Sequence, residues 1–121
     1  METKRKGSRI KKAIWILAKK GENAEAIFAL PNGIKIQKNI GKATQAQADH
    51  LAMQEALDIA SKEKGKIIIY TESALLEGQL IKKWQIKANR KLAYATKKKF
   101  KGIRDKVNVY KINKKENLAR K

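Results

Sequence analysis

Short apolar runs separated by turn residues follow the first dozen residues of the chain. The run 13–18, AIWILA, predicts a short strand. Apolar and polar positions alternate well enough over 24–30 to predict a second strand, and the Pro-Asn-Gly sequence after it is a hairpin signal. Ile34, Ile36 and Ile40 then fall on one face of a third strand. This pattern predicts a meander of antiparallel strands.

The segment from Thr44 to about Lys62 has the periodicity of an amphipathic helix. Thr44 and Gln47 have the spacing of a capping box, in which each side chain bonds the backbone N–H of the other residue. The apolar positions gather near one face, at Ala48, Leu51, Ala52, Ile59 and Ala60. We therefore predict one long helix, which Gly65 ends.

The remaining residues alternate between strand and helix patterns. The apolar run within 66–71 suits a central strand buried on both faces. Ser73 then caps a short helix, a basic helix spans about 88–101, a fifth strand covers 107–112, and a last short helix starts in 113–116. The predicted order is βββ-α-β-α-α-β-α, which is typical of a mixed five-stranded α/β sheet with helices packed on it.

At 121 residues, of which 42% are hydrophobic, the chain has the length of a single domain with one modest core. We expect residues 1–12 to form a basic disordered arm and residues 13–121 to form that domain. The absence of cysteine excludes disulfides, thiolate metal sites and thiol nucleophiles. Because no apolar run approaches the roughly 20 residues of a membrane span, we expect a cytoplasmic protein with no membrane partner.

The formal net charge of +19 is distributed unevenly. Residues 76–121 carry sixteen Lys and Arg against three Asp and Glu, whereas residues 44–60 carry three acidic residues and no basic one. Such a cationic surface favours a polyanion, and nucleic acid is the expected partner. The alternative is a lysine-rich surface that serves solubility alone.

Few residues with catalytic chemistry are present. His50 is the single histidine, and the absence of a Ser-His-Asp or Cys-His set excludes nucleophilic hydrolysis of that type. The glycines are isolated in turns, so no phosphate-binding loop is predicted. Glu72 stands at a strand-to-helix corner, which favours one of two interpretations: an acid at a helix N-terminus, or a catalytic carboxylate.

Two segments resemble type 1 ribonuclease H. Thr44–Leu57, TQAQADHLAMQEAL, is similar to the family's first-helix pattern TxNxAE(Y)xAxxxAL, with matches at Thr44, Ala48, Ala52, Ala56 and Leu57. Thr71–Lys87, TESALLEGQLIKKWQIK, is similar to the pattern (T/S)DSxLV…QLxGxWxVK, with matches at Thr71, Ser73, Leu75, Gln79, Leu80, Trp84 and Lys87. The resemblance covers roughly residues 13–121 and implies the ribonuclease H-like fold, a five-stranded mixed sheet whose first three strands are antiparallel.

The resemblance also implies an activity. The family cleaves the RNA strand of RNA–DNA hybrids with two magnesium ions, held by acids on the first strand, the first helix, the end of the fourth strand and the last helix. Asp49 stands where the family's helix has Glu, and Glu72 stands where its fourth strand has Asp. Each exchange changes the side-chain length by one methylene, which damages a site whose Mg–O distances are about 2.0–2.1 Å.

The first-strand position lacks an acid altogether. Depending on the register it holds Ala18, Lys19 or Lys20. A lysine there would sit beside Asp49 and Glu72, and its ammonium group would replace the charge of the metal.

The last acidic position holds Glu116, Asn117 or Arg120, and of these only Glu116 could bind a metal. The resemblance therefore implies a vestigial or weak catalytic set of Asp49, Glu72 and Glu116. Asp49 and Glu72 would be metal ligands only if activity is retained, with Mg²⁺ or Mn²⁺ as the cofactor. Otherwise no cofactor is expected.

The same resemblance places nucleic-acid contacts in the basic C-terminal half. The run 96–101, TKKKFK, looks like the basic handle that follows the second helix in some family members, and phosphate contacts there would raise affinity without reading sequence. Trp84 matches an aromatic near the contacts to the DNA strand, and its alternative role is an anchor at the edge of the core. The expected contacts are Lys82, Lys83, Trp84, Lys87, Arg90, Lys91, Lys97, Lys98, Lys99, Lys101 and Arg104.

Three functional hypotheses follow. The first is a ribonuclease H-like domain without catalytic activity that binds RNA or an RNA-containing duplex through its basic C-terminal half. The second is a weakly active, metal-dependent ribonuclease H that cleaves RNA in RNA–DNA hybrids. The third is a ribosome-associated or other assembly scaffold.

Overall fold

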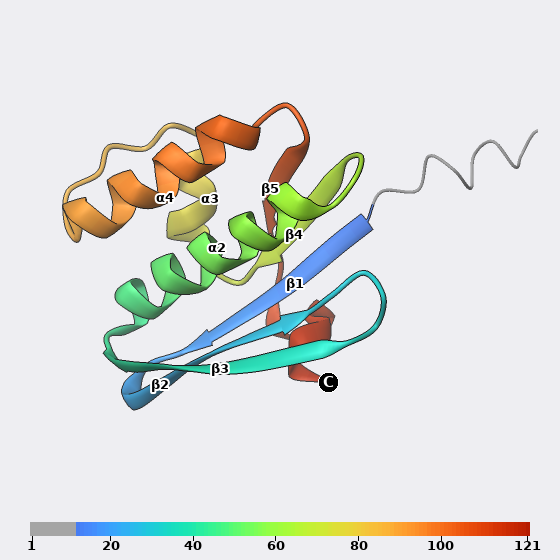
Figure 1. Ribbon diagram of the computed structural model, residues 1–121. Helices are drawn as coiled ribbons and strands as arrows, with labels where there is room; N and C mark the ends of the chain where they lie inside the picture. The colour runs from blue at the N-terminus through green and yellow to red at the C-terminus, as the bar shows by residue number, and fades with distance from the viewer. Residues whose placement is uncertain (1–11) are drawn as a thin grey trace, which may run out of the picture.

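The computed structural model describes residues 12–121 (Figure 1). The expected disordered arm therefore lies outside the described residues, except for Lys12, which begins the first strand. The elements in chain order are β1 (Lys12–Lys19), β2 (Gly21–Ala29), β3 (Lys35–Ala43), α2 (Gln45–Lys62), β4 (Ile67–Thr71), α3 (Ala74–Leu80), α4 (Arg90–Ile103), β5 (Val107–Lys111), and the 3-10 turns η1 (Lys114–Glu116) and η2 (Leu118–Arg120). The predicted order of elements is confirmed, with two 3-10 turns in place of the last helix.

The five strands form one mixed sheet in the order β3-β2-β1-β4-β5, as the fold class predicted. Strands β1, β2 and β3 pair antiparallel because short turns connect them. Strands β4 and β5 each pair parallel with the preceding neighbour in the sheet, and their connections run through helices. The parallel pairing of β1 and β4 brings the carboxyl ends of these two strands to the same edge of the sheet.

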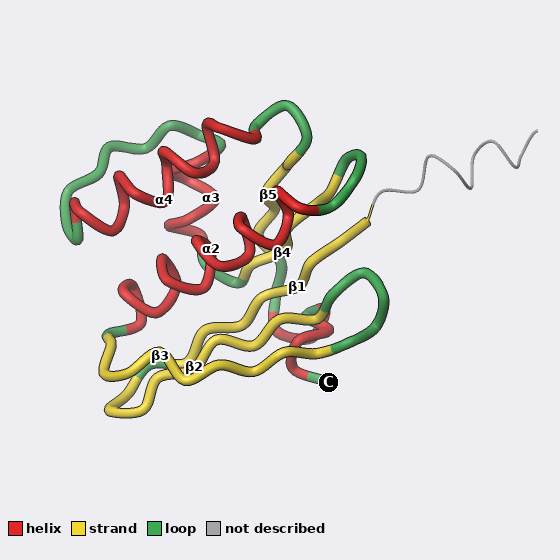
Figure 2. The backbone as a smooth tube through the Cα atoms, in the orientation of Figure 1, coloured by secondary structure: helices red, strands yellow, loops and turns green. Residues whose placement is uncertain are grey.

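Helices α2, α3 and α4 lie on one face of the sheet, and η2 contacts β1 and β2 from the other (Figures 1 and 2). The main core fills the space between the sheet and α2. Ile14, Phe28 and Ile69 point to this side from three strands and are fully buried. Met53 and Leu57 of α2 pack against them. Within residues 12–121, no helix combines the length and hydrophobicity that crossing a membrane would require.

The capping signals are confirmed in detail. The N–H of Gln47 donates to Thr44 Oγ1 over 3.2 Å, and the N–H of Thr44 donates to Gln47 Oε1 over 2.9 Å. Ser73 Oγ accepts from the N–H of Leu76 at the start of α3. One detail of the strand prediction is wrong: Ile34 precedes β3 and is 56% exposed, because it belongs to the turn before that edge strand.

The buried face of α2 differs slightly from the predicted one. Ala48, Ala52 and Ala60 are fully buried as expected, whereas Leu51 and Ile59 are half-buried. Wider side chains fill the centre of the face, and these include His50 and Met53. Because the small alanines let α2 lie close to the sheet, the polar start of the helix comes near the ends of β1 and β4.

Candidate functional site

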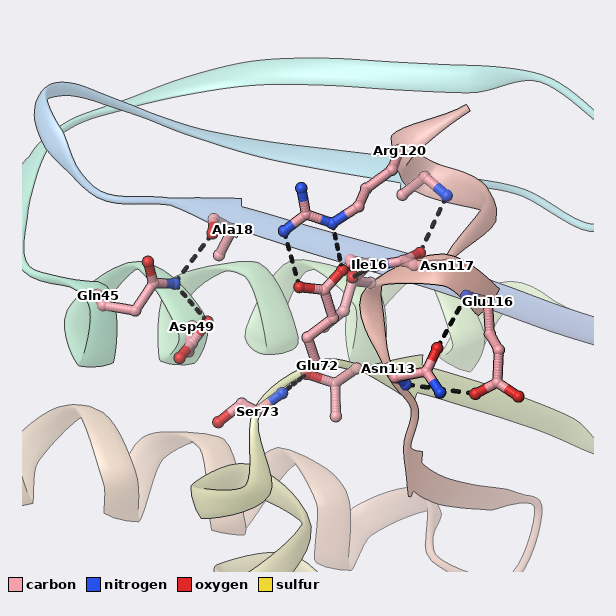
Figure 3. A network of polar contacts seen from close by, with 12 residues as sticks. Ile16, Ala18, Gln45, Asp49, Glu72, Ser73, Asn113, Glu116, Asn117 and Arg120 are labelled. Carbon is pink, nitrogen blue, oxygen red and sulfur yellow. Dashed lines mark hydrogen bonds and ion pairs between the residues drawn. The ribbon is translucent and has the colours of Figure 1, made fainter.

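The carboxyl ends of β1 and β4 open into a cavity of about 280 Å³ beside the first turns of α2. Its polar lining includes Gln45 and Asp49 from α2, Glu72 and Ser73 from the end of β4, and Arg120 from η2. A crevice outside the carboxyl ends of parallel strands is the usual position of a ligand site in an open α/β sheet. The two predicted acids Asp49 and Glu72 therefore do meet at one site (Figure 3).

Glu72 is bound by a guanidinium group. Arg120 Nε donates to Glu72 Oε2 over 2.6 Å, and Arg120 Nη2 donates to Glu72 Oε1 over 2.8 Å, which makes the pair bidentate. These hydrogen bonds are the main cause of a lowered pKa of Glu72, and Asn117 with the charges of Arg120 and Lys114 contributes further. Burial acts in the opposite direction on this pKa.

Asn117 holds the C-terminal segment in place. Its Nδ2 donates to the backbone oxygen of Ile16 in β1 and to Glu72 Oε2, each over 2.9 Å. Its Oδ1 accepts from the N–H of Ala119 over 3.0 Å, which caps η2. Asn117 is completely buried, so the amide ties β1, the end of β4 and η2 together at one point. The side chain of Arg120 is thereby aimed at Glu72 (Figure 3).

Asp49 has no such cation. Gln45 Nε2 donates to Asp49 Oδ1 over 3.0 Å and to the backbone oxygen of Ala18 over 2.9 Å, so Gln45 links the carboxylate to β1. The pKa of Asp49 is raised to about 6, mainly by burial and to a smaller extent by the negative charge of Glu72, and hydrogen bonds from Gln45 and Ser73 limit the rise. No ion pair involves Asp49 within the described part of the chain.

The other predicted members of the site lie elsewhere. Lys19 and Lys20 do not line the cavity; the first strand contributes the apolar side chains of Ile16 and Ala18 instead. The expected lysine is therefore replaced by an arginine from the opposite end of the chain. Glu116 also lies outside the cavity, and its carboxylate accepts from the N–H of Asn113 in a capping box (Figure 3).

These residues do not fit a two-metal centre. Within residues 12–121, no three His, Asp or Glu side chains come together in a way that could hold a metal ion. Magnesium requires near-octahedral coordination by oxygen atoms. Of the two carboxylates present, Glu72 is already bound to a cation, and burial raises the pKa of Asp49 and so opposes its ionised, metal-binding form.

A basic surface covers the outer side of α4. This helix buries Ala93, Thr96 and Phe100 and turns most of its charged residues outward. The predicted contacts on or beside it that are exposed are Arg90, Lys91, Lys98, Lys99, Lys101 and Arg104, and Lys97 is half-buried. We call these seven residues the α4 basic surface. The exposed Tyr94, which the sequence analysis did not single out, lies among them on the helix.

Trp84 and its lysine neighbours lie in the segment between α3 and α4. Lys82, Lys83, Trp84 and Lys87 are all exposed. The ring of Trp84 lies directly on Gly78 of α3, where an added Cβ would come within 2.1 Å of Trp84 Cε3. The ring nevertheless remains 46% exposed, with Lys82 Nζ at 5.9 Å from its centroid. Trp84 is therefore an anchor on α3 that still presents part of its ring to solvent.

The residues that sequence reasoning underrated are Gln45, Asn117 and Arg120. Gln45 is the first residue of α2, and its spacing of four from Asp49 is a signal for a helical side-chain pair. Asn117 and Arg120 were considered only as occupants of an acidic position. No local pattern indicates that both would bond Glu72.

Several solved structures similar to this chain are ribonuclease H domains. The N-terminal RNase H domain of a Mycobacterium tuberculosis protein, solved as a fusion with maltose-binding protein, has a TM-score of 0.72 at 19% identity over 91% of this chain and 92% of that one. Ribonuclease H1 of the archaeon Halobacterium salinarum has a TM-score of 0.61 at 18% identity, over 86% and 84% of the two chains. A ribonuclease H1 isolated from compost, in complex with an RNA/DNA hybrid, has a TM-score of 0.71 at 14% identity, over 89% of each.

No protein-family model and no curated protein matches the sequence. The structural similarity shows that the chain has the ribonuclease H-like fold, and the predicted resemblance to type 1 ribonuclease H is confirmed at the level of the fold.

Proposed function

We propose that this domain binds RNA or an RNA-containing duplex through the α4 basic surface, and that it has lost hydrolytic activity. The observation that carries the loss of activity is the bidentate bond of Arg120 to Glu72. A metal ion at Glu72 would have to displace a guanidinium that is fixed at both carboxylate oxygens. The missing first-strand acid and the raised pKa of Asp49 support the same conclusion.

Binding is supported by the charge and exposure of α4. The helix places seven Lys and Arg on and beside one outer surface, in a chain with a formal net charge of +19. Two of the predicted cations are partly engaged, because Lys99 pairs with Asp58 over 2.8 Å and Lys82 pairs with Glu77 over 3.6 Å. The others are exposed, except for the half-buried Lys97, and exposed cations can neutralise phosphates and release counterions.

The test is a salt titration of binding to an RNA hairpin. The double variant Lys98→Gln/Lys101→Gln removes two charges from α4, and we expect it to flatten the slope of log affinity against log salt by about 1 per lysine. The control is Lys38→Gln/Lys42→Gln, which removes two charges from β3, the edge strand that lies farthest from β5 in the sheet. Equal loss in both variants would contradict a role for the α4 basic surface, and a native slope near zero would contradict phosphate binding altogether.

The competing enzyme hypothesis keeps one supporting observation, the convergence of Asp49 and Glu72 on one cavity. We test it by incubating a labelled RNA–DNA hybrid with Mn²⁺ and either the native protein or Asp49→Asn/Glu72→Gln. Cleavage by the native protein that the double variant abolishes would contradict the proposed loss of activity. A scaffold role would instead be supported by co-sedimentation with ribosomes that survives high salt.

A further inference from the structure

The face of the sheet away from α2 carries a row of aromatic side chains. The registers of the five strands align Lys35, Ala29, Trp15, Tyr70 and Tyr110 as direct neighbours, one residue from each strand. The rings of Trp15 and Tyr70 stack with centroids 4.3 Å apart, and the rings of Tyr70 and Tyr110 are 6.2 Å apart. Trp15, Tyr70 and Tyr110, which we call the aromatic row, thus lie side by side across three strands, with Trp15 and Tyr70 stacked and Tyr110 tilted against Tyr70.

The aromatic row is not part of the core. Side chains alternate along a strand, so Ile14, Ile69 and the fully buried Val109 point to α2 while their neighbours in the row point the other way. Trp15 and Tyr70 are half-buried, and Tyr110 is 46% exposed on β5, the edge strand. Cross-strand aromatic pairing stabilises a sheet, but it does not require the outermost ring to face solvent.

Two exposed lysines share this face with the row. Lys35 ends it on β3, and the exposed Lys19 lies on the same face two positions beyond Leu17. The nearby carboxylate of Glu72 is neutralised by Arg120. The carboxylate of Glu25, the cross-strand neighbour of Lys19, also lies on this face and accepts a hydrogen bond from Gln37. The face therefore combines aromatic rings with two exposed lysines, and aromatic rings and basic side chains are the features that bind single-stranded nucleic acids.

We propose that the aromatic row is a stacking platform for the bases of a single-stranded nucleic acid. Bases pack on the exposed ring of Tyr110 and on the exposed parts of the half-buried Tyr70 and Trp15 beside it, and the lysines of the same face attract the phosphates. This inference shares with the proposed function only the choice of nucleic acid as partner, because the row and the α4 basic surface belong to opposite faces of the sheet. A duplex cannot use the platform, since its bases are already stacked on one another.

The experiment uses Trp15 as a reporter within the row. The chain has two tryptophans, so Trp84→Phe leaves Trp15 as the single one. We expect a short oligouridylate to quench the Trp15 fluorescence of this full-length variant in a saturable way. A blunt-ended RNA duplex that binds the same protein, measured by fluorescence anisotropy of a labelled RNA, should leave the Trp15 signal unchanged.

A second variant measures the contribution of the exposed ring. Tyr110→Thr keeps a residue suited to a strand, and we expect it to weaken oligouridylate binding about tenfold while the affinity for the blunt-ended duplex stays the same. The control is Tyr94→Thr, which removes a tyrosine that is 56% exposed on α4, away from the row, and should leave oligouridylate affinity unchanged. Circular dichroism confirms that each variant is folded.

Several results would overturn the platform. Absence of Trp15 quenching in the Trp84→Phe protein would overturn the platform. This measurement leaves the row unaltered, so it remains decisive even if Tyr110→Thr fails to fold. Unchanged oligouridylate affinity in a folded Tyr110→Thr protein would also overturn the platform. If analytical ultracentrifugation shows a dimer that Tyr110→Thr abolishes, the row would instead be an interface with a second copy of the chain. Binding of the blunt-ended duplex without quenching would leave the proposed function intact. Quenching by oligouridylate without binding of the duplex would refute duplex binding alone.

Discussion

Replacing Arg120 by Ala tests the ion pair that occupies the candidate site. In the native protein the guanidinium contacts both oxygens of Glu72, at 2.6 and 2.8 Å. The substitution leaves the side-chain amide of Asn117 as the remaining hydrogen-bond donor to this carboxylate among the described side chains. Because the side chain of Glu72 is only 19% exposed, its charge is then poorly solvated, and we expect the free energy of unfolding to fall.

The magnitude lies between two limits. Breaking a fully buried pair costs about 3–5 kcal/mol, and exposed pairs contribute about 0.2–1 kcal/mol. The side chain of Arg120 is 35% exposed, so solvent screens the pair and the cost is well below the buried limit. The persisting bond from Asn117 lowers it further. We expect a loss of about 1–2 kcal/mol at neutral pH, which lowers Tm by roughly 4–10 °C for a domain of this size.

A double-mutant cycle isolates the pair from other effects of truncation. Urea unfolding is measured for the native protein, Arg120→Ala, Glu72→Gln and the double variant. The pKa of Glu72 is lowered in the folded state, so the stabilisation is present above its ordinary pKa of 4.5 and disappears as the pH falls through the lower folded value. The coupling energy should therefore be positive at pH 7 and shrink in strong acid.

Arg104→Ala provides the matched control, because this exposed arginine forms no ion pair among the described residues. Its effect should stay within about 0.5 kcal/mol. A coupling energy of zero between positions 72 and 120 at pH 7 would refute the reasoning, and so would a coupling that persists unchanged at acid pH.

Three further predictions concern neighbouring groups. Asp49→Asn should raise the free energy of unfolding at pH 8 by about 1–2 kcal/mol. The pKa of the native carboxyl is raised to about 6, mainly by burial, so its ionisation above that pH opposes folding. A urea midpoint equal to that of the native protein at pH 8 would contradict this. His50 is buried with a lowered pKa, it bonds Thr96 through Nδ1, and its Nε2 has no hydrogen-bond partner among residues 12–121. Native stability should therefore fall as the pH drops below 6.5, and it should fall less in His50→Gln. Gly78→Ala should displace the ring of Trp84 and destabilise the protein by about 1–3 kcal/mol despite the better helix propensity of Ala; an unshifted Trp84 emission spectrum would show that the ring does not need this glycine.

Local patterns predicted most of the fold because they act over a few residues. The capping pair Thr44 and Gln47 marks the start of α2, and the apolar run before Glu72 marks the buried strand β4. Pattern matches to a known family then assigned Asp49 and Glu72 to one site, although these residues lie on separate elements. The errors occur where a strand edge meets solvent, as at Ile34, whose apolar side chain is exposed.

The partner of Glu72 was not predictable in the same way. Arg120 is 48 residues distant in sequence, and it reaches the carboxylate only because buried Asn117 ties η2 to β1. Thirty Lys and Arg compete for eleven acids in this chain, so composition favours no particular pair. Sequence reasoning accordingly proposed a nearby first-strand lysine, whereas the strand presents Ile16 and Ala18 to the cavity.

The order of the amino acids alone was sufficient to establish the strands, the helices and the cationic character, since periodicity, capping and charge are properties of short segments. Folding decided which cation neutralises the buried acid and which aromatic rings align across the sheet. Both outcomes depend on strand register and on the path of the chain terminus. A shift of one residue in the register of a strand would send all its side chains to the opposite face of the sheet.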